Sequence, residues 1–368
     1  MIIKSSELVV IFNEFLTSRI KEINISPFFT DEIICSINFE KKLFTKKVTK
    51  SSWDDSLRKT VQQYSLSERA HLELPNYNEI INKIVSAGVN QPKGIEKLIS
   101  YIRTNLDTNK MKRIIIGLDT NQLIYCTMSN FIEQALSQNP HHKNLKFRVN
   151  YAIAQWVMWE KSQFLRTEKR DENSALSELA TAFKDKGYYL GGKIDKQARL
   201  GYGIIAELKA LENNTMKLAT DNIRLGLDEK EIRSNKEARD EAIISEYCYL
   251  KNYLDDFVVF VSSDKNAISM AKGRKLDETF EITIPNEISN TYPCDFTQTA
   301  KLLYQLTLLF GSIRINNELF KINIWFSPKE EFHWEEQWVA IECKDNEFFS
   351  KIKKSINLIR MFNSKYSI

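Results

Sequence analysis

Four acidic residues are spaced along the chain so that they could form one cluster of carboxylates: Asp119, Glu160, Asp240 and Asp264. Asp119 follows the apolar run 114–116 in RIIIGLDTNQLIY, and Asp264 follows the run 257–261 in FVVFVSSDKN. Unbroken apolar runs of this length predict strands that are buried on both faces, as in a parallel sheet covered by helices. Because ligands bind beyond the carboxyl ends of such strands, both Asp side chains are expected in one cleft.

Asp240 and Glu160 are predicted to reach the same cleft from helices. Asp240 stands near the start of a predicted helix, SNKEARDEAIISEYCYL, and shares a side of it with Ile244 and Tyr247. Glu160 lies on the apolar face of the predicted helix YAIAQWVMWEKSQFL, which includes Ile153. A buried carboxylate is costly without a positive partner, so Glu160 needs either a metal ion or an Arg or Lys side chain.

Glu207 is an alternative to Glu160, because it shares a predicted helical face with Leu200, Ile204 and Leu211. Phe147 and Val149 predict a second strand, and Glu160 is preferred since it follows this strand by a short connection. Structural roles also remain open for the other acids. Asp119 and Asp264 are good helix N-caps, and Asp240 is well placed for the positive end of a helix dipole.

The chemistry of such a cluster follows from its charge. Carboxylates that converge in one cleft repel each other, and they stay ionised together only around cations. Ligation by oxygen alone suits Mg²⁺ or Mn²⁺. A metal held in this way activates water and offsets the charge that develops on a phosphodiester, so the acids act as metal ligands.

These motifs resemble the PIN-domain superfamily of nucleases over about residues 112–285, through GLDTN, DEAII and VFVSSDKN. The resemblance implies an α/β fold with a central parallel sheet flanked by helices. It implies an endoribonuclease that uses Mg²⁺ or Mn²⁺ and acts on RNA. The implied catalytic and metal-binding residues are Asp119, Glu160, Asp240 and Asp264, supported by Asn121 and Ser263.

Two other functions are alternatives to the nuclease. A PIN-like module that binds nucleic acid or protein without cleavage would not need all four acids. A phosphatase of the haloacid-dehalogenase type would want a second Asp two residues after Asp119, where this chain has Asn121.

Composition is typical of a soluble globular protein, with 43% hydrophobic and 27% charged residues in 368. The chain has no apolar run long enough to span a bilayer and no signal-peptide pattern, so a cytoplasmic location without membrane contact is expected. Five scattered cysteines and four histidines disfavour a zinc site. The net charge of +4 includes basic clusters at residues 40–50 and 351–368, which are candidate phosphate contacts.

Three regions are expected. Residues 1–110 form a helical accessory region with helices at about 77–85 and 92–106. Residues 111–290 form the PIN-like nuclease domain, with a helical insertion at about 166–220. Residues 291–368 form a C-terminal α+β extension that contains a helix at 295–311, a hairpin from KINIWF and WVAIEC, and a basic terminal helix with Ile352, Ile356 and Ile359 facing inward. The tryptophans and phenylalanines of residues 325–338 are expected in the core of the hairpin rather than as base-stacking groups.

Overall fold

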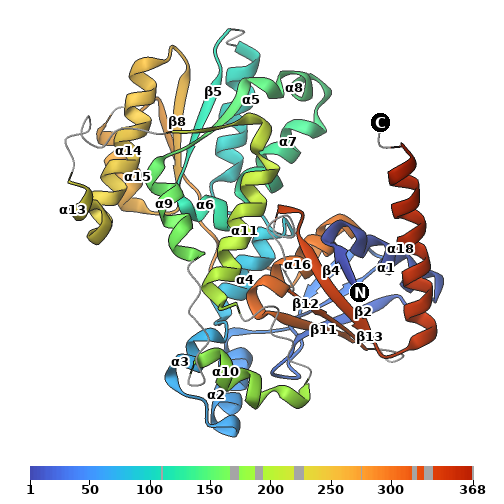
Figure 1. The fold of residues 1–368 in the computed structure, drawn as a ribbon. Coiled ribbons are helices and arrows are strands. Elements are labelled where there is room, and N and C mark those ends of the chain that lie inside the picture. Colours follow the sequence, from blue (N-terminus) through green and yellow to red (C-terminus); the bar gives the residue numbers. More distant parts are fainter. Residues whose placement is uncertain are drawn as a thin grey trace. The chain divides into compact units, whose positions relative to one another are not determined.

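The computed structural model describes residues 1–368 except 109–110, 166–173, 187–193, 219–227, 275, 317–320, 327–334 and 367–368. The chain forms two compact units (Figure 1). Unit 1 consists of Met1–Asn90, Thr167–Leu200 and Asn286–Ile368. Unit 2 consists of Gln91–Arg166 and Gly201–Pro285, and it contains all four candidate acids.

Unit 2 is built on a five-stranded parallel sheet in the order β7-β6-β5-β8-β9. The strands predicted at residues 114–116 and 257–261 and the predicted α/β class are confirmed. Both central strands, β5 and β8, are buried along most of their length, which explains why their sequences show no alternation of apolar and polar residues. The strands are β5 (Ile114–Leu118), β6 (Val149–Ile153), β7 (Thr215–Lys217), β8 (Phe257–Ser262) and β9 (Glu278–Glu281).

Helices flank this sheet (Figure 1). They are α5 (Ile95–Thr108), α6 (Thr120–Ile124), α7 (Glu133–Gln138), α8 (Pro140–Leu145), α9 (Gln155–Phe164), α11 (Lys196–Ala210), α13 (Glu229–Ser234), α14 (Lys236–Tyr253) and α15 (Lys265–Gly273). The chain of α11 begins in unit 1 and continues into unit 2. The helix predicted from residue 151 starts only at Gln155, because Tyr151 and Ile153 belong to strand β6.

Tyr247 fixes α14 against the carboxyl ends of the central strands. Its buried hydroxyl donates to the carbonyl oxygen of Leu118, at 2.7 Å, and accepts from the backbone N–H of Ala154, at 3.1 Å. Its ring lies against Gly117, where an added Cβ would meet ring atoms at 2.9 Å. The glycine of GLDTN therefore gives the ring room, and the ring holds the helix that carries Asp240.

Unit 1 contains an antiparallel sheet of eight strands in the order β1-β13-β12-β11-β2-β3-β4-β10. Its strands are β1 (Ile2–Lys4), β2 (Glu22–Pro27), β3 (Cys35–Asn38), β4 (Leu43–Lys46), β10 (Thr291–Pro293), β11 (Ser312–Asn316), β12 (Lys321–Trp325) and β13 (Trp338–Cys343). The predicted strands at residues 321–325 and 338–343 are confirmed. Residues 1–110 were predicted to be helical, whereas β1–β4 lie there and pair in one sheet with strands from residues 291–343.

The helices predicted before residue 110 are confirmed, although the last of them begins at Ile95 rather than at residue 92. The helices of unit 1 are α1 (Leu8–Thr17), α2 (Lys50–Tyr64), α3 (Glu68–Glu73), α4 (Tyr77–Ser86), α10 (Ala175–Ala182), α16 (Phe296–Phe310) and α18 (Asn346–Tyr366). Stacked rings of Phe12, Phe15 and Phe39 form part of its core. Short helical turns occur at Ser5–Glu7, Met128–Ile132, Lys146–Arg148, Lys184–Lys186 and Glu212–Asn214.

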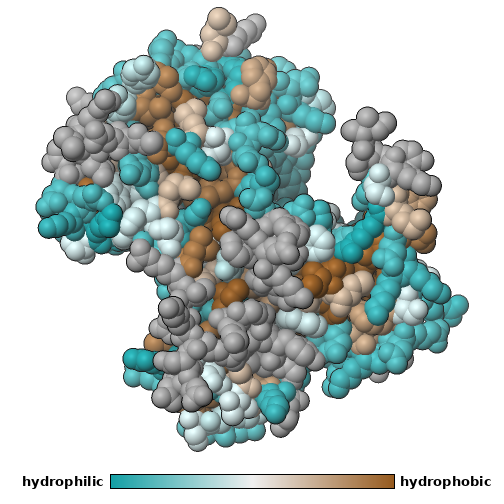
Figure 2. All heavy atoms as spheres, viewed as in Figure 1, coloured by the Kyte–Doolittle hydropathy of each residue, from teal (hydrophilic) through white to brown (hydrophobic). Residues whose placement is uncertain are grey.

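The terminal helix α18 is confirmed, with one correction. Ile352 and Ile356 are buried as predicted, but Ile359 is 40% exposed, because the last turns of the helix extend past the packed surface. Figure 2 shows apolar residues on the surface near this end of α18. Among the described residues, no helix is long and apolar enough to cross a membrane.

Candidate functional site

The four predicted acids line one pocket of unit 2. The pocket has a volume of about 540 Å³ and lies where β5 and β8 end. Asp119 and Asp264 follow these strands directly, while Glu160 comes from α9 and Asp240 from α14. The other lining residues are Thr120, Asn121, Ile124, Trp159, Gln163, Phe164, Arg233, Ser234, Lys236 and Arg239.

Asp119 is the N-cap of α6 and the most buried of the four acids, at 9% exposure. Its carboxylate accepts hydrogen bonds from the backbone N–H of Thr120 and the hydroxyl of Ser262, both at 2.7 Å, and from the amide of Asn121 at 3.4 Å. Burial raises the pKa of Asp119, and the bond from Ser262 is the largest influence that opposes this rise. The orientation of this carboxylate is thus fixed by the strand ends and not by solvent.

Asp264 caps the next helix, α15, by accepting from the N–H groups of Asn266 and Ala267. Its other oxygen pairs with the ammonium group of Lys236, which lowers the pKa of Asp264. The backbone N–H of Asp264 donates to the Ser262 hydroxyl at 2.9 Å. Ser262 therefore links the two aspartates.

Ser263 is the predicted supporting residue, but the hydroxyl that contacts Asp119 belongs to its neighbour Ser262. The Ser263 side chain makes no hydrogen bond with any residue that the structure describes. In a strand, neighbouring side chains point to opposite faces, so a shift by one residue moves a hydroxyl away from Asp119. The other predicted supporting residue, Asn121, does contact Asp119.

Asp240 is half-buried, and its side chain forms no hydrogen bond or ion pair within the described part of the chain. Burial raises the pKa of Asp240 to about 6, and the negative charge of Asp119 adds to this effect. Both causes are those that a bound cation would oppose, since a cation stabilises an ionised carboxylate.

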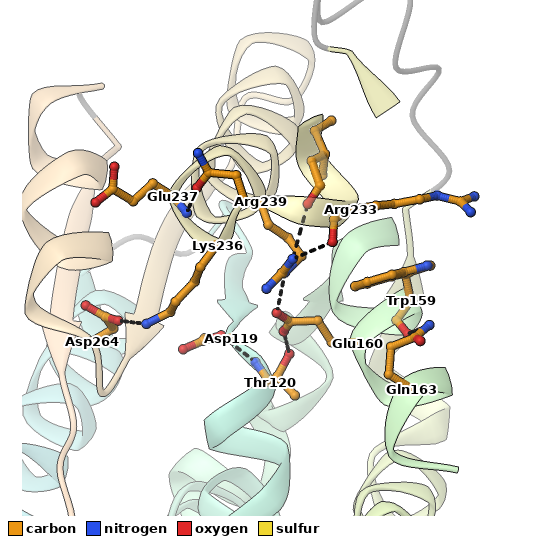
Figure 3. A network of polar contacts seen from close by, with 12 residues as sticks. Asp119, Thr120, Trp159, Glu160, Gln163, Arg233, Lys236, Glu237, Arg239 and Asp264 are labelled. Carbon is orange, nitrogen blue, oxygen red and sulfur yellow. Dashed lines mark hydrogen bonds and ion pairs between the residues drawn. The ribbon is translucent and has the colours of Figure 1, made fainter. Parts of the chain in front are cut away.

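Glu160 has the positive partner that its apolar surroundings require. The guanidinium group of Arg239 donates from Nε to the Glu160 carboxylate at 2.8 Å, and the Thr120 hydroxyl donates to the other oxygen. Arg239 also donates to the carbonyl oxygen of Ile232 at 3.2 Å and lies over the ring of Trp159, 5.4 Å from its centroid. Figure 3 shows Asp119 between the Arg239–Glu160 pair and the Lys236–Asp264 pair.

Glu207, the alternative second acid, does not line this pocket. It is 2% exposed, and its carboxylate accepts from the backbone N–H of Ser129, at 3.0 Å, and from the Ser129 hydroxyl. These contacts join α11 to the short helical turn Met128–Ile132. The geometry therefore associates Glu160 with the three aspartates and gives Glu207 a structural partner.

The donor atoms of the pocket fit a hard divalent cation in kind, because they are carboxylate, hydroxyl and amide oxygens. Among the residues described, however, no three His, Cys, Asp or Glu side chains stand together as a ready metal site. Lys236 and Arg239 neutralise two of the four carboxylates instead. Within the described residues, Asp119 and Asp240 are the pocket acids that form no ion pair.

Sequence reasoning missed the two basic residues that pair with acids of the pocket. Lys236 and Arg239 precede Asp240 by four residues and one residue, in the motif KEARD. Residues four apart on a helix share a face, so Lys236 could have been placed beside Asp240 from its spacing. The partner of Arg239, in contrast, is 79 positions away in the sequence, and only the fold brings the two together.

One comparison with known families gives a match. The family model of the PIN domain matches residues 116–279, which run from β5 to β9 and include all four acids. No curated protein and no solved structure matched the chain. The family match agrees with the parallel sheet and with acids at the ends of its central strands. Residues 116–279 of this chain therefore match the PIN-domain family.

Proposed function

We propose that this protein is an endoribonuclease that hydrolyses phosphodiester bonds of RNA with Mg²⁺ or Mn²⁺. The observation that carries the proposal is the convergence of Asp119, Glu160, Asp240 and Asp264 on one pocket within the matched PIN domain. Their oxygens are the ligands that such cations prefer. When bound, the cation supplies an activated water and offsets charge on the phosphodiester.

The protein's own residues prepare the pocket for this task. The Ser262 hydroxyl and the N–H of Thr120 hold the Asp119 carboxylate in one orientation. Arg239 and the Thr120 hydroxyl hold the Glu160 carboxylate in the same way. Positioning groups of this kind reduce the reorganisation that these two carboxylates would undergo when a cation binds.

Nucleic acid as the partner is supported by the basic side chains at the pocket. Arg233, Lys236 and Arg239 line it together with the acids, so an anionic backbone finds positive groups beside the carboxylates. Trp159 and Phe164 add aromatic rings to the same wall. The preference for RNA over DNA follows from the resemblance to PIN nucleases, and it is part of the proposal.

A non-catalytic binding module is the second candidate. It is favoured by one observation, the two ion pairs that occupy Asp264 and Glu160. A module that only binds would retain these pairs and would have no use for the raised pKa of Asp240.

The test compares cleavage of matched single-stranded RNA and DNA by the full chain with Mg²⁺, Mn²⁺ or EDTA. The variant is Asp119→Asn, which keeps the shape of the side chain but replaces a carboxylate with a poorer ligand for a hard cation. Glu237→Gln is the matched control, because Glu237 is exposed on α14 and does not line the pocket. Circular dichroism of all three proteins checks that each is folded.

A nuclease cleaves RNA with metal, stops in EDTA, loses activity in Asp119→Asn and keeps it in Glu237→Gln. Binding of RNA without cleavage in either metal, unchanged by Asp119→Asn, would instead identify the binding module. Equal cleavage of DNA and RNA would retain the nuclease and refute the RNA preference.

A further inference from the structure

Lys236 forms the more accessible of the two ion pairs in the pocket. Its side chain is 67% exposed and pairs with Asp264, which is 21% exposed. The Arg239–Glu160 pair is only 16% and 20% exposed, and further hydrogen bonds hold Arg239 in place. Because exposed ion pairs are weak, Lys236 can leave its partner at little cost, whereas Arg239 is fixed.

The position of Lys236 in its helix is unfavourable for a cation. Lys236 is the first residue of α14, a helix of 18 residues, and the N-terminus of a helix carries a partial positive charge. Asp264 offsets this repulsion in the present arrangement. The charge of Lys236 is thus stabilised by Asp264 and not by the dipole of its own helix.

We propose that Lys236 is a phosphate-binding residue that exchanges Asp264 for the nucleic-acid backbone when a divalent cation binds the acids. The inference rests on the proposed function and adds to it a residue that touches the substrate. Arg239 remains with Glu160 and acts as a positioning residue.

The exchange follows from the charges in the pocket. A divalent cation and an ammonium group compete for the same Asp264 carboxylate, and like charges so close repel each other. Once the cation binds, Lys236 loses its counter-ion at the edge of the pocket. Its flexible four-carbon stem and compact charge suit a phosphate that lies beside the acids. Figure 3 shows the Lys236 side chain extending from the start of α14 toward Asp264.

Exchange predicts opposite effects of one substitution on two ligands. Removing the ammonium group frees Asp264 and should strengthen metal binding. The same change removes a phosphate contact and should weaken nucleic-acid binding. A lysine that serves only to stabilise the folded pocket would not produce this pair of effects.

Metal binding is measured by calorimetric titration of the full chain with Mn²⁺ in the absence of nucleic acid. Lys236→Gln should bind Mn²⁺ about two- to five-fold more tightly, which is the loss of one exposed ion pair. The control is Lys251→Gln, because Lys251 lies on the same helix and pairs with Asp277 at 2.9 Å outside the pocket. Unchanged or weaker Mn²⁺ binding by Lys236→Gln overturns the competition.

Nucleic-acid binding is measured by fluorescence anisotropy of a short single-stranded RNA over a series of KCl concentrations, in Ca²⁺ and in EDTA, with gels to check that the RNA stays intact. In Ca²⁺, Lys236→Gln should reduce the slope of log K against log salt by about 0.7, the value for one phosphate contact on a single strand. In EDTA the slopes of wild type and variant should agree, because Asp264 then holds Lys236. Lys236→Arg should restore the slope in Ca²⁺.

Equal loss of slope in Ca²⁺ and EDTA would show a permanent phosphate contact and would refute the exchange. No loss in either condition would refute the contact itself. Both results are independent of cleavage. If neither Mg²⁺ nor Mn²⁺ supports cleavage but Lys236→Gln changes Mn²⁺ binding and RNA binding as described, the proposed nuclease function is refuted and the proposed role of Lys236 is supported.

Discussion

Replacing Asp240 with Asn should stabilise the metal-free protein, because the ionised carboxylate of Asp240 destabilises the folded state. Its pKa is raised from the ordinary value of 3.8 to about 6 by burial and by the charge of Asp119. The folded protein therefore holds the proton more tightly than the unfolded chain does. The ionised carboxylate destabilises the folded state fully above the folded pKa of about 6, and the penalty disappears as the pH falls below the unfolded value.

The size of the effect follows from this difference in pKa. At about 1.4 kcal/mol for each pH unit, the difference corresponds to roughly 3 kcal/mol. Asp240 is only half-buried, so solvent screening reduces the figure to about 1–2 kcal/mol. At about 2–4 °C per kcal/mol, Asp240→Asn should raise the melting temperature in EDTA by roughly 2–8 °C near pH 8. The gain should shrink near pH 5, where the wild-type carboxyl is largely protonated.

Divalent metal should reverse the order of the two proteins. A ligand at about 100 times its dissociation constant stabilises the folded state by about 2.7 kcal/mol. Wild type should gain this from Mn²⁺, and Asp240→Asn should gain much less since it lacks one carboxylate. The measurement is differential scanning fluorimetry across pH, with and without Mn²⁺, and Glu237→Gln is the control. A lower melting temperature for Asp240→Asn in EDTA, or a gain that does not depend on pH, would refute the reasoning.

Two further predictions concern the second acid and the glycine under the tyrosine ring. Glu160→Gln should fold normally and lose metal-dependent cleavage. Glu207→Gln should keep cleavage and lose about 1–3 kcal/mol of stability, because the hydrogen bonds from Ser129 to a charged carboxylate are weakened. Loss of cleavage in Glu207→Gln alone would contradict this assignment. Gly117→Ala should cost about 1–3 kcal/mol, measured by urea unfolding, because the new Cβ would lie 2.9 Å from ring atoms of Tyr247. An unchanged unfolding midpoint would show that the ring moves aside freely.

The apolar runs in the sequence determined much of the region that matches the PIN domain. Consecutive isoleucines and valines predict strands covered on both faces, and β5 and β8 are such strands. Polar residues that follow a buried strand lie at the sheet edge, so Asp119 and Asp264 could be predicted to meet. Local rules therefore sufficed for the acids at the strand ends.

Only the tertiary structure decided which helical acid joins them. Glu160 and Glu207 both lie on apolar helical faces, and periodicity does not distinguish them. The partners do: Arg239 reaches Glu160, and Ser129 reaches Glu207, across 79 and 78 residues of sequence. The choice between Ser262 and Ser263 likewise depended on the exact end of β8.

The strands of unit 1 were hidden from the sequence for a similar reason. β1 pairs with β13, and β4 with β10, so residues near the start of the chain complete a sheet with residues near its end. A short strand is stabilised by its neighbours in the sheet more than by its own residues. The sequence alone thus determined the strands whose apolar residues predict burial. The short strands of unit 1 form only because the fold brings distant segments of the chain together.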